Sequence, residues 1–216
     1  SLFITMILLM PFGYYLTFLG RELPDYERVK KQKVGNPVGR QIMLISYFYT
    51  DIIGQPLVRR GVSPDTVSFV SMMFGAAAGI ALGFSQFGIG AVLFFCSGFL
   101  DVVDGIVARG LNKSSAGGAV IDSTFDRYVD FFVLAGIAVH YRSDVFMLGL
   151  ALAAILGSFM ISYSSAKAEA IGAEPPRGGM KRTERGPLLV LGATLSAFSI
   201  PTVEAGMSLS VGFGLP

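Results

Sequence analysis

The chain has 216 residues, of which 52% are hydrophobic and 15% charged, and its mean hydropathy is +0.62. This composition excludes an ordinary water-soluble domain and indicates one integral membrane unit. The formal net charge of +2 is too small to indicate nucleic-acid binding, and the single cysteine, Cys96, excludes an intramolecular disulfide.

Apolar windows of about 20 residues predict helices that span the membrane. We expect seven such segments, the last two of them short: 1–19, 65–84, 88–108, 118–140, 145–166, 186–200 and 203–216. The expected fold class is therefore all-α, a polytopic integral membrane protein.

The first 60 residues contain two further features. The segment 1–19 lacks the basic start of a signal peptide, so we expect a span or a membrane-embedded helix there. After a charged stretch, the more apolar segment from Ile42 to Val58 predicts a helix lying flat in the membrane interface. A plain cytoplasmic linker is the alternative for this segment.

Small residues and basic residues indicate packing and orientation. Gly75 and Gly79 have the small-xxx-small spacing that lets helices approach closely in lipid. If the spans alternate, nearly all Lys and Arg fall on one side of the membrane, whereas Arg142 falls on the other and Arg127 lies within a span. The positive-inside rule makes the first side cytoplasmic.

Four aspartates stand in otherwise apolar, glycine-rich sequence: Asp101, Asp104, Asp122 and Asp126. An aspartate at the centre of a bilayer costs about 2.5 to 3.5 kcal/mol, so four facing lipid would cost roughly 10 to 14 kcal/mol. We therefore expect them to face the protein interior near one membrane interface, on the cytoplasmic side.

Helical spacing places the first two acids on one face. If 98–110 is helical, Asp101 is followed at one-turn intervals by Gly105 and Arg109. Asp104 lies beside this stripe. One helix face would thus carry two acids, a small residue and a cation.

The second pair of acids has the same relation on the next segment. Asp122 and Asp126 are one turn apart, and Gly118, one turn earlier, removes a side chain where a facing helix must come close. The hairpin 110–117 between the two segments is short and polar. We therefore expect the two acidic faces to meet.

Converging carboxylates suit the hard cations Mg²⁺ or Mn²⁺, and the near absence of His and Cys argues against zinc. A pair of such ions can clamp a pyrophosphate, and Arg109 can bind a phosphate through two hydrogen bonds. The residues therefore predict a metal site that holds a nucleotide diphosphate. The alternatives are ion pairs of the acids with Arg109, Lys113 and Arg127, or an ion pathway in a transporter.

The full spacing reads D-x-x-D-G-x-x-A-R, eight residues, then G-x-x-x-D-x-x-x-D. At every fixed position it resembles the signature of the CDP-alcohol phosphotransferase family of membrane enzymes. The resemblance begins near Gly61. It implies a transmembrane domain with a six-helix core at 61–216, and an N-terminal region at 1–60 that adds a hydrophobic segment and an interfacial helix.

Enzymes of this family transfer a phosphatidyl or phospho-alcohol group from a CDP-linked donor to an acceptor hydroxyl and release CMP. The resemblance implies a site for Mg²⁺ or Mn²⁺, with two ions, and the general base Asp126. The implied metal ligands are Asp101, Asp104, Asp122 and Asp126. The implied CDP contacts are Gly105, Arg109, Ser115, Asp65 and Thr66.

The run from Asp122 to Arg127 is similar to the D-S-T-x-D-R run of bacterial phosphatidylinositol-phosphate synthases within the family. Similarity to the same enzymes around Lys167 and in 181–185 implies that Lys167, Arg182 and Arg185 lie near the metal site. There they would bind a phosphate of the acceptor. Ordinary positive-inside flanking charge is the alternative for these cations.

We therefore expect transfer of a phosphatidyl group from CDP-diacylglycerol to inositol phosphate. The enzyme would be a homodimer in the inner membrane with its active site on the cytoplasmic side. One alternative is the same chemistry with glycerol 3-phosphate or another polar alcohol. The other is a cation-dependent transporter, which would need access to the acids from both sides of the membrane.

Overall fold

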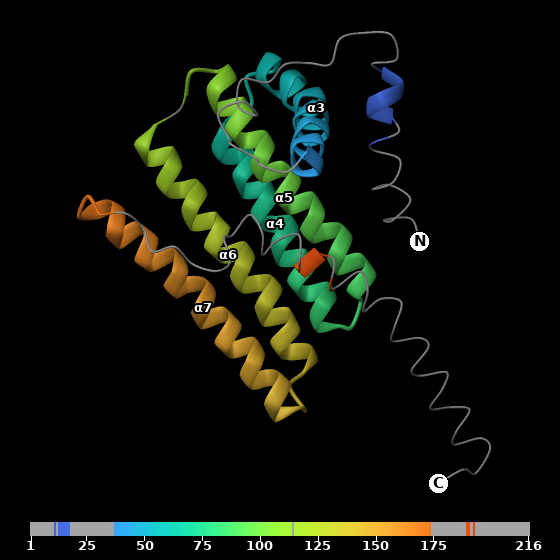
Figure 1. Cartoon of the computed structure of the whole chain (residues 1–216), viewed down its shortest axis with the longest axis vertical. Coiled ribbons are helices and arrows are strands. Elements are labelled where there is room, and N and C mark those ends of the chain that lie inside the picture. The colour runs from blue at the N-terminus through green and yellow to red at the C-terminus, as the bar shows by residue number, and fades with distance from the viewer. Residues whose placement is uncertain are drawn as a thin grey trace, which may run out of the picture.

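In the computed structural model, the described residues are 11, 13–17, 37–113, 115–173, 189–190 and 192 (Figure 1). All regular secondary structure among them is helical, which confirms the expected all-α class. The labelled helices are α3 (Pro37–Arg59), α4 (Pro64–Gly83), α5 (Phe87–Gly110), α6 (Ala116–His140) and α7 (Val145–Ala170).

Three of these helices, α4, α5 and α7, are long and apolar enough to cross a membrane. They confirm the expected segments 65–84, 88–108 and 145–166 to within a few residues. The segment 118–140 is the helix α6, which is of similar length but carries more charge. Most of 1–19 and of 186–200, and all of 203–216, lie outside the described residues. The division into regions at residue 60 stays a prediction.

Helices α4, α5 and α6 form a bundle, and α7 lies along the outer side of α6 (Figure 1). The two neighbours in sequence, α5 and α6, pack chiefly against α4 and much less closely against each other. Helix α4 is therefore the common support of the two helices that carry the predicted site.

Local sequence signals explain where the helices begin. Pro64 opens the first turn of α4, where its missing N–H costs nothing. Ser115 caps α6 by accepting a hydrogen bond from the backbone N–H of Gly118 at 3.0 Å. Asp144 caps α7 in the same way, with its carboxylate accepting from the N–H groups of Phe146 and Met147.

Glycines bring α4 and α6 into direct backbone contact. A methyl group at Gly79 would collide with the carbonyl oxygen of Phe132, and one at Gly136 would collide with the carbonyl oxygen of Gly79. One turn earlier, a methyl at Gly75 would lie 2.8 Å from Val129. The small-xxx-small pair predicted from sequence therefore serves helix packing.

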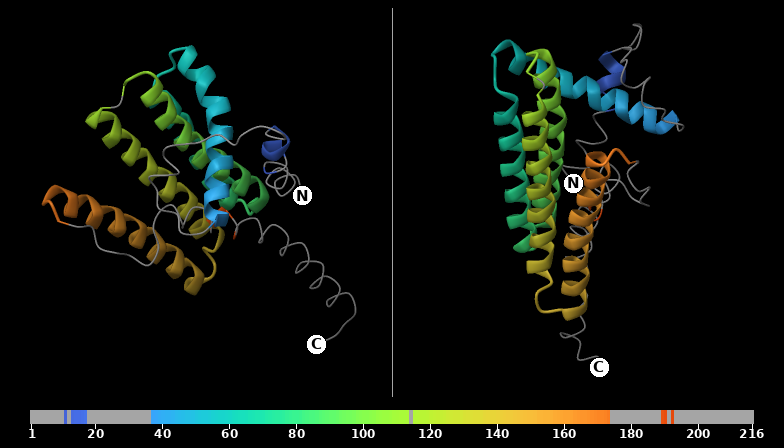
Figure 2. Two further views of the ribbon diagram at one scale, coloured as in Figure 1. Left: turned by 45° about the horizontal axis from the view of Figure 1, so that its top comes forward. Right: turned by 90° about the vertical axis from the view of Figure 1, so that its left-hand side faces the viewer.

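The segment 42–58, for which a linker was the alternative, is part of the helix α3. This helix runs crosswise at one end of the bundle (Figure 2, right), as expected of an interfacial helix. It packs against the end of α5, where Gly54 meets Ile106 and Val58 meets Gly110. Helix α3 therefore covers the same end of the bundle at which α5 ends and α6 begins.

Candidate active site

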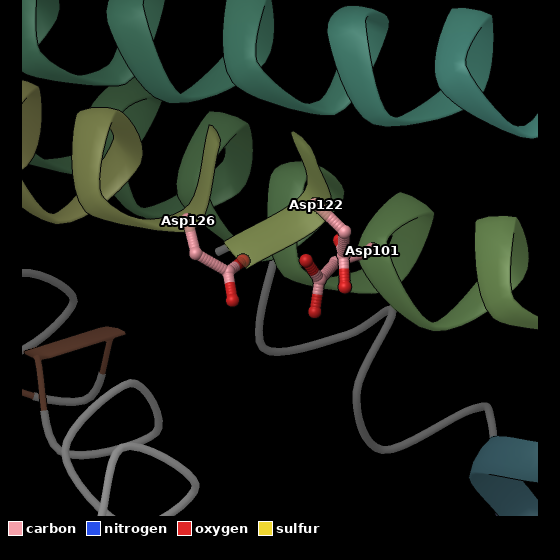
Figure 3. Close-up of side chains that lie close together, drawn as sticks. All are labelled: Asp101, Asp122 and Asp126. Atoms are coloured by element: carbon pink, nitrogen blue, oxygen red, sulfur yellow. The ribbon is translucent and has the colours of Figure 1, made fainter. Parts of the chain in front are cut away.

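Three carboxylates converge between α5 and α6. Asp101 of α5 and Asp122 and Asp126 of α6 each offer an oxygen, and these oxygens lie within 4.8 Å of one another. Figure 3 shows the three side chains pointing to the same side of their helices, with Asp101 next to Asp122. Asp126 is buried, and the other two are half-buried. The acidic faces therefore meet as expected, and the three oxygens are close enough to share one cation.

The convergence has a local and a non-local cause. Asp122 and Asp126 share a face because they are one helical turn apart. Asp101 reaches them because the short α5–α6 turn reverses the chain and because α4 supports both helices. Asn112 in this turn has a φ of 53°, a conformation that asparagine tolerates better than most residues.

Asp104, the fourth predicted ligand, has a different environment. Its side chain is buried, and its Oδ2 accepts a hydrogen bond of 2.6 Å from the hydroxyl of Ser68 on α4. It is not one of the three carboxylates that converge. Its role as a metal ligand stays a prediction, and the structure adds a partner to it that sequence reasoning missed.

The stripe formed by Asp101, Gly105 and Arg109 is present as expected. The guanidinium of Arg109 folds back over Gly105. Its Nη1 lies 2.9 Å from the place that a Cβ of residue 105 would occupy. A larger residue at 105 would therefore displace Arg109. The glycine keeps this cation on the same helix face as Asp101.

A second cation lies directly beside the acids. Nη1 of Arg127 is 3.7 Å from Oδ2 of Asp126 and donates a 2.6 Å hydrogen bond to the carbonyl of Ser123. The long distance to Asp126 and the short one to the carbonyl show that the backbone is the main anchor of Arg127. Ion pairing with Arg127 is thus a minor interaction of Asp126.

The predicted CDP contacts at the bundle end have separate structural positions. Asp65 and Thr66 are exposed in the first turn of α4, where an acid also suits the helix dipole. Ser115 is the cap of α6, so its hydroxyl oxygen already accepts one hydrogen bond. Their contacts with a nucleotide stay predictions.

Of the predicted acceptor-binding cations, Lys167 is exposed near the C-terminal end of α7. That end of α7 faces the same way as the start of α6, because the two helices are antiparallel neighbours (Figure 1). Arg182 and Arg185 lie outside the described residues.

The structure also reveals an acid that sequence reasoning did not single out. Asp130 is buried on α6 one turn beyond Asp126, and its Oδ2 accepts a 2.8 Å hydrogen bond from Ser158 of α7. The i, i+4 spacing from Asp126 was the signal that could have found it. Ser68 had no comparable signal, because its partner is 36 residues away in sequence.

Comparison with known proteins agrees with this geometry. The sequence model of the CDP-alcohol phosphatidyltransferase family matches residues 62–213. The phosphatidylinositol phosphate synthase of Streptomyces avermitilis is 30% identical over 166 residues, which are 72% of this chain and 67% of that protein.

Solved structures of the phosphatidylinositol phosphate synthase of Mycobacterium tuberculosis are similar too. The one with CDP-DAG bound has a TM-score of 0.65 at 29% identity and covers 69% of this chain and 77% of that chain. The one in complex with manganese and citrate has a TM-score of 0.63 at 29% identity, over 69% and 73% of the two chains. This integral membrane protein therefore belongs to the CDP-alcohol phosphatidyltransferase family.

Proposed function

We propose that the chain transfers the phosphatidyl group of CDP-diacylglycerol to a hydroxyl of inositol phosphate and releases CMP. The observation that carries the proposal is the convergence of Asp101, Asp122 and Asp126 in a member of this family. Two relatives named phosphatidylinositol phosphate synthase support the acceptor, and the relative with CDP-DAG bound supports the donor.

The acids fit a divalent cation such as Mg²⁺ or Mn²⁺. Three carboxylate oxygens within 4.8 Å of one another form a hard, oxygen-only ligand set, and the relative from Mycobacterium tuberculosis binds manganese. We propose that Asp101, Asp122 and Asp126 hold the metal together with Asp104, and that the site takes two ions. Bound metal would neutralise the negative charge that develops on the transferred phosphate and on CMP.

The protein groups divide the remaining chemistry. Asp126 takes the proton of the acceptor hydroxyl, whose oxygen then forms a bond to the phosphorus that bears diacylglycerol. The P–O–P link to the cytidylate breaks, and CMP leaves with the electron pair. Arg109, held over Gly105, binds a phosphate of the donor through paired hydrogen bonds. A general base of this kind contributes about 10² to 10⁴-fold to a rate.

The location of the site suits a lipid donor and a polar acceptor. The acids lie in the halves of α5 and α6 that face the α5–α6 turn, so the donor chains can stay beside apolar helices while the headgroup reaches the acids. We propose that this end faces the cytoplasm across the inner membrane, because Arg109, Lys113 and Lys167 gather there. Lys167, with Arg182 and Arg185, would bind the phosphate of the acceptor, and two copies would form a homodimer.

One assay tests the reaction and the acceptor. Purified protein in nanodiscs receives CDP-diacylglycerol and Mg²⁺ with inositol phosphate, glycerol 3-phosphate or free inositol, and released CMP is measured. We expect release with inositol phosphate alone. Release of CMP with glycerol 3-phosphate instead would identify glycerol 3-phosphate as the acceptor. Absence of CMP release with every alcohol would overturn the proposed reaction and favour the transporter alternative.

The role of Asp126 has its own test. The D126N variant keeps the shape of the side chain but cannot take a proton, so we expect CMP release to fall about 10² to 10⁴-fold while CDP binding remains. D144N is the matched control, because it makes the same exchange at the N-terminal cap of α7. This cap lies near the end of α6 that is far from the acids, and asparagine also caps helices well. Retained turnover in D126N would contradict the assigned role.

A further inference from the structure

The family signature lies on α5 and α6, yet the structure connects it to a side chain of α4. Ser68 and Asp104 are both 6% exposed, and the serine hydroxyl lies 2.6 Å from Oδ2 of the carboxylate. This distance is typical of a hydroxyl that donates to an ionised acid. The hydroxyl also lies 3.2 Å from the carbonyl of Pro64, but its single proton favours the shorter contact with a charge.

We propose that Ser68 is a positioning residue of the metal site, which holds Asp104 so that the carboxylate binds the cation through its other oxygen. The inference rests on the proposed function, since it presumes that Asp104 is a ligand. A carboxylate can accept several hydrogen bonds, so Oδ2 can keep its serine partner while Oδ1 remains for the metal. Partners of this kind orient metal ligands and raise their affinity.

The place of Asp104 in the bundle explains why such a partner is needed. Its helix carries Asp101 three residues earlier, and Asp101 meets the α6 acids while Asp104 is directed to α4. Without a side-chain donor on α4, the buried carboxylate would be free to rotate away from the metal. Ser68 supplies the donor from the helix that supports both α5 and α6.

A second serine provides a matched control within the same interface. Ser71 is one turn further along α4 and 4% exposed, and its hydroxyl donates a 2.8 Å hydrogen bond to the carbonyl of Ser97 on α5. It therefore joins the same two helices through a buried serine hydroxyl, but its acceptor is a backbone carbonyl. Any general effect of losing a serine from the α4–α5 interface should appear equally in S68A and S71A.

The experiment measures Mn²⁺ binding without turnover, by electron paramagnetic resonance on protein in nanodiscs. We expect S68A to raise the dissociation constant roughly tenfold or more, in the range that outer partners of metal ligands show, and S71A to leave it unchanged. In the D104N background, S68A should have no further effect, because its action passes through Asp104. If S68A does not fold, S68C replaces it, since a thiol of similar size donates weakly.

The outcomes separate the inference from the proposed function. Wild-type protein that binds no Mn²⁺ or releases no CMP would overturn the proposed function. Wild-type protein that binds Mn²⁺ while S68A binds it equally well would overturn the role of Ser68 alone. An equal loss of affinity in S71A, or a full effect of S68A in the D104N background, would also overturn it.

Discussion

Helix α6 is held on its two sides by different means. Toward α4 its backbone touches the backbone of the neighbour, because Gly79 and Gly136 remove the side chains between them. Toward α7 the described contact includes a hydrogen bond between two side chains, Ser158 and Asp130, and most large apolar side chains of α7 are exposed. The acids of α6 are thus rigidly placed relative to α4 and α5, whereas the helix that carries Lys167 is joined more loosely.

The largest effect is expected from a methyl group at the α4–α6 crossing. G79A and G136A each force a backbone carbonyl away, so we expect a loss of about 3 kcal/mol of stability and of most activity. The measurement is the melting temperature in detergent together with CMP release. Unchanged values would show that the crossing is not as tight as its geometry indicates.

Two neighbours on the same face of α4 calibrate this result. At Gly75 the obstacle is the side chain of Val129, which can shift, so G75A should cost less than G79A. At Gly83 a methyl would lie 3.5 Å from Val139, an ordinary contact, so G83A should be neutral or slightly stabilising. The expected order of melting temperatures is G83A above G75A above G79A.

A moderate effect is expected on the α7 side. S158A removes a hydroxyl that donates to the buried Asp130, which should cost about 1 kcal/mol in a membrane bundle. S164A is the control, because in the described part of the chain that hydroxyl donates within its own helix, to the carbonyl of Ile161. A loss of stability in S158A as large as that in G79A would contradict the difference between the two sides of α6, since α7 would then be held as firmly as α4.

The smallest effect is expected at Lys167, which is exposed. K167A should raise the KM for inositol phosphate several-fold and leave the KM for CDP-diacylglycerol and the melting temperature unchanged, because the charge would meet only the acceptor phosphate. K113A removes an exposed cation from the α5–α6 turn at the same end and should change neither KM. Equal changes in both KM values for K167A would favour plain flanking charge.

Much of the site could be predicted from local spacing. The one-turn intervals of Asp101, Gly105 and Arg109, and of Asp122 and Asp126, place them on two helix faces in any α-helix, and the structure brings these faces together. The expected spans 65–84, 88–108 and 145–166 followed from length and apolar composition, and the helices α4, α5 and α7 match them to within a few residues. For the segment 42–58 the sequence allows either an interfacial helix or a linker, because a short, more apolar stretch does not decide this by itself.

The sequence by itself determined the helices, the acidic faces and the kind of cation that they suit, because these depend on residue type and on the 3.6-residue period. Only the tertiary structure decided that α4 supports both acidic helices, that Ser68 holds Asp104 and that Asp130 meets Ser158. Those contacts join residues on different helices, and they depend on how closely and at what register the helices cross. In this bundle the helices cross with their backbones in contact at Gly79 and Gly136. The spacing of Gly75 and Gly79 indicates a close approach, but it does not identify the partner helix or the residue that faces Gly79.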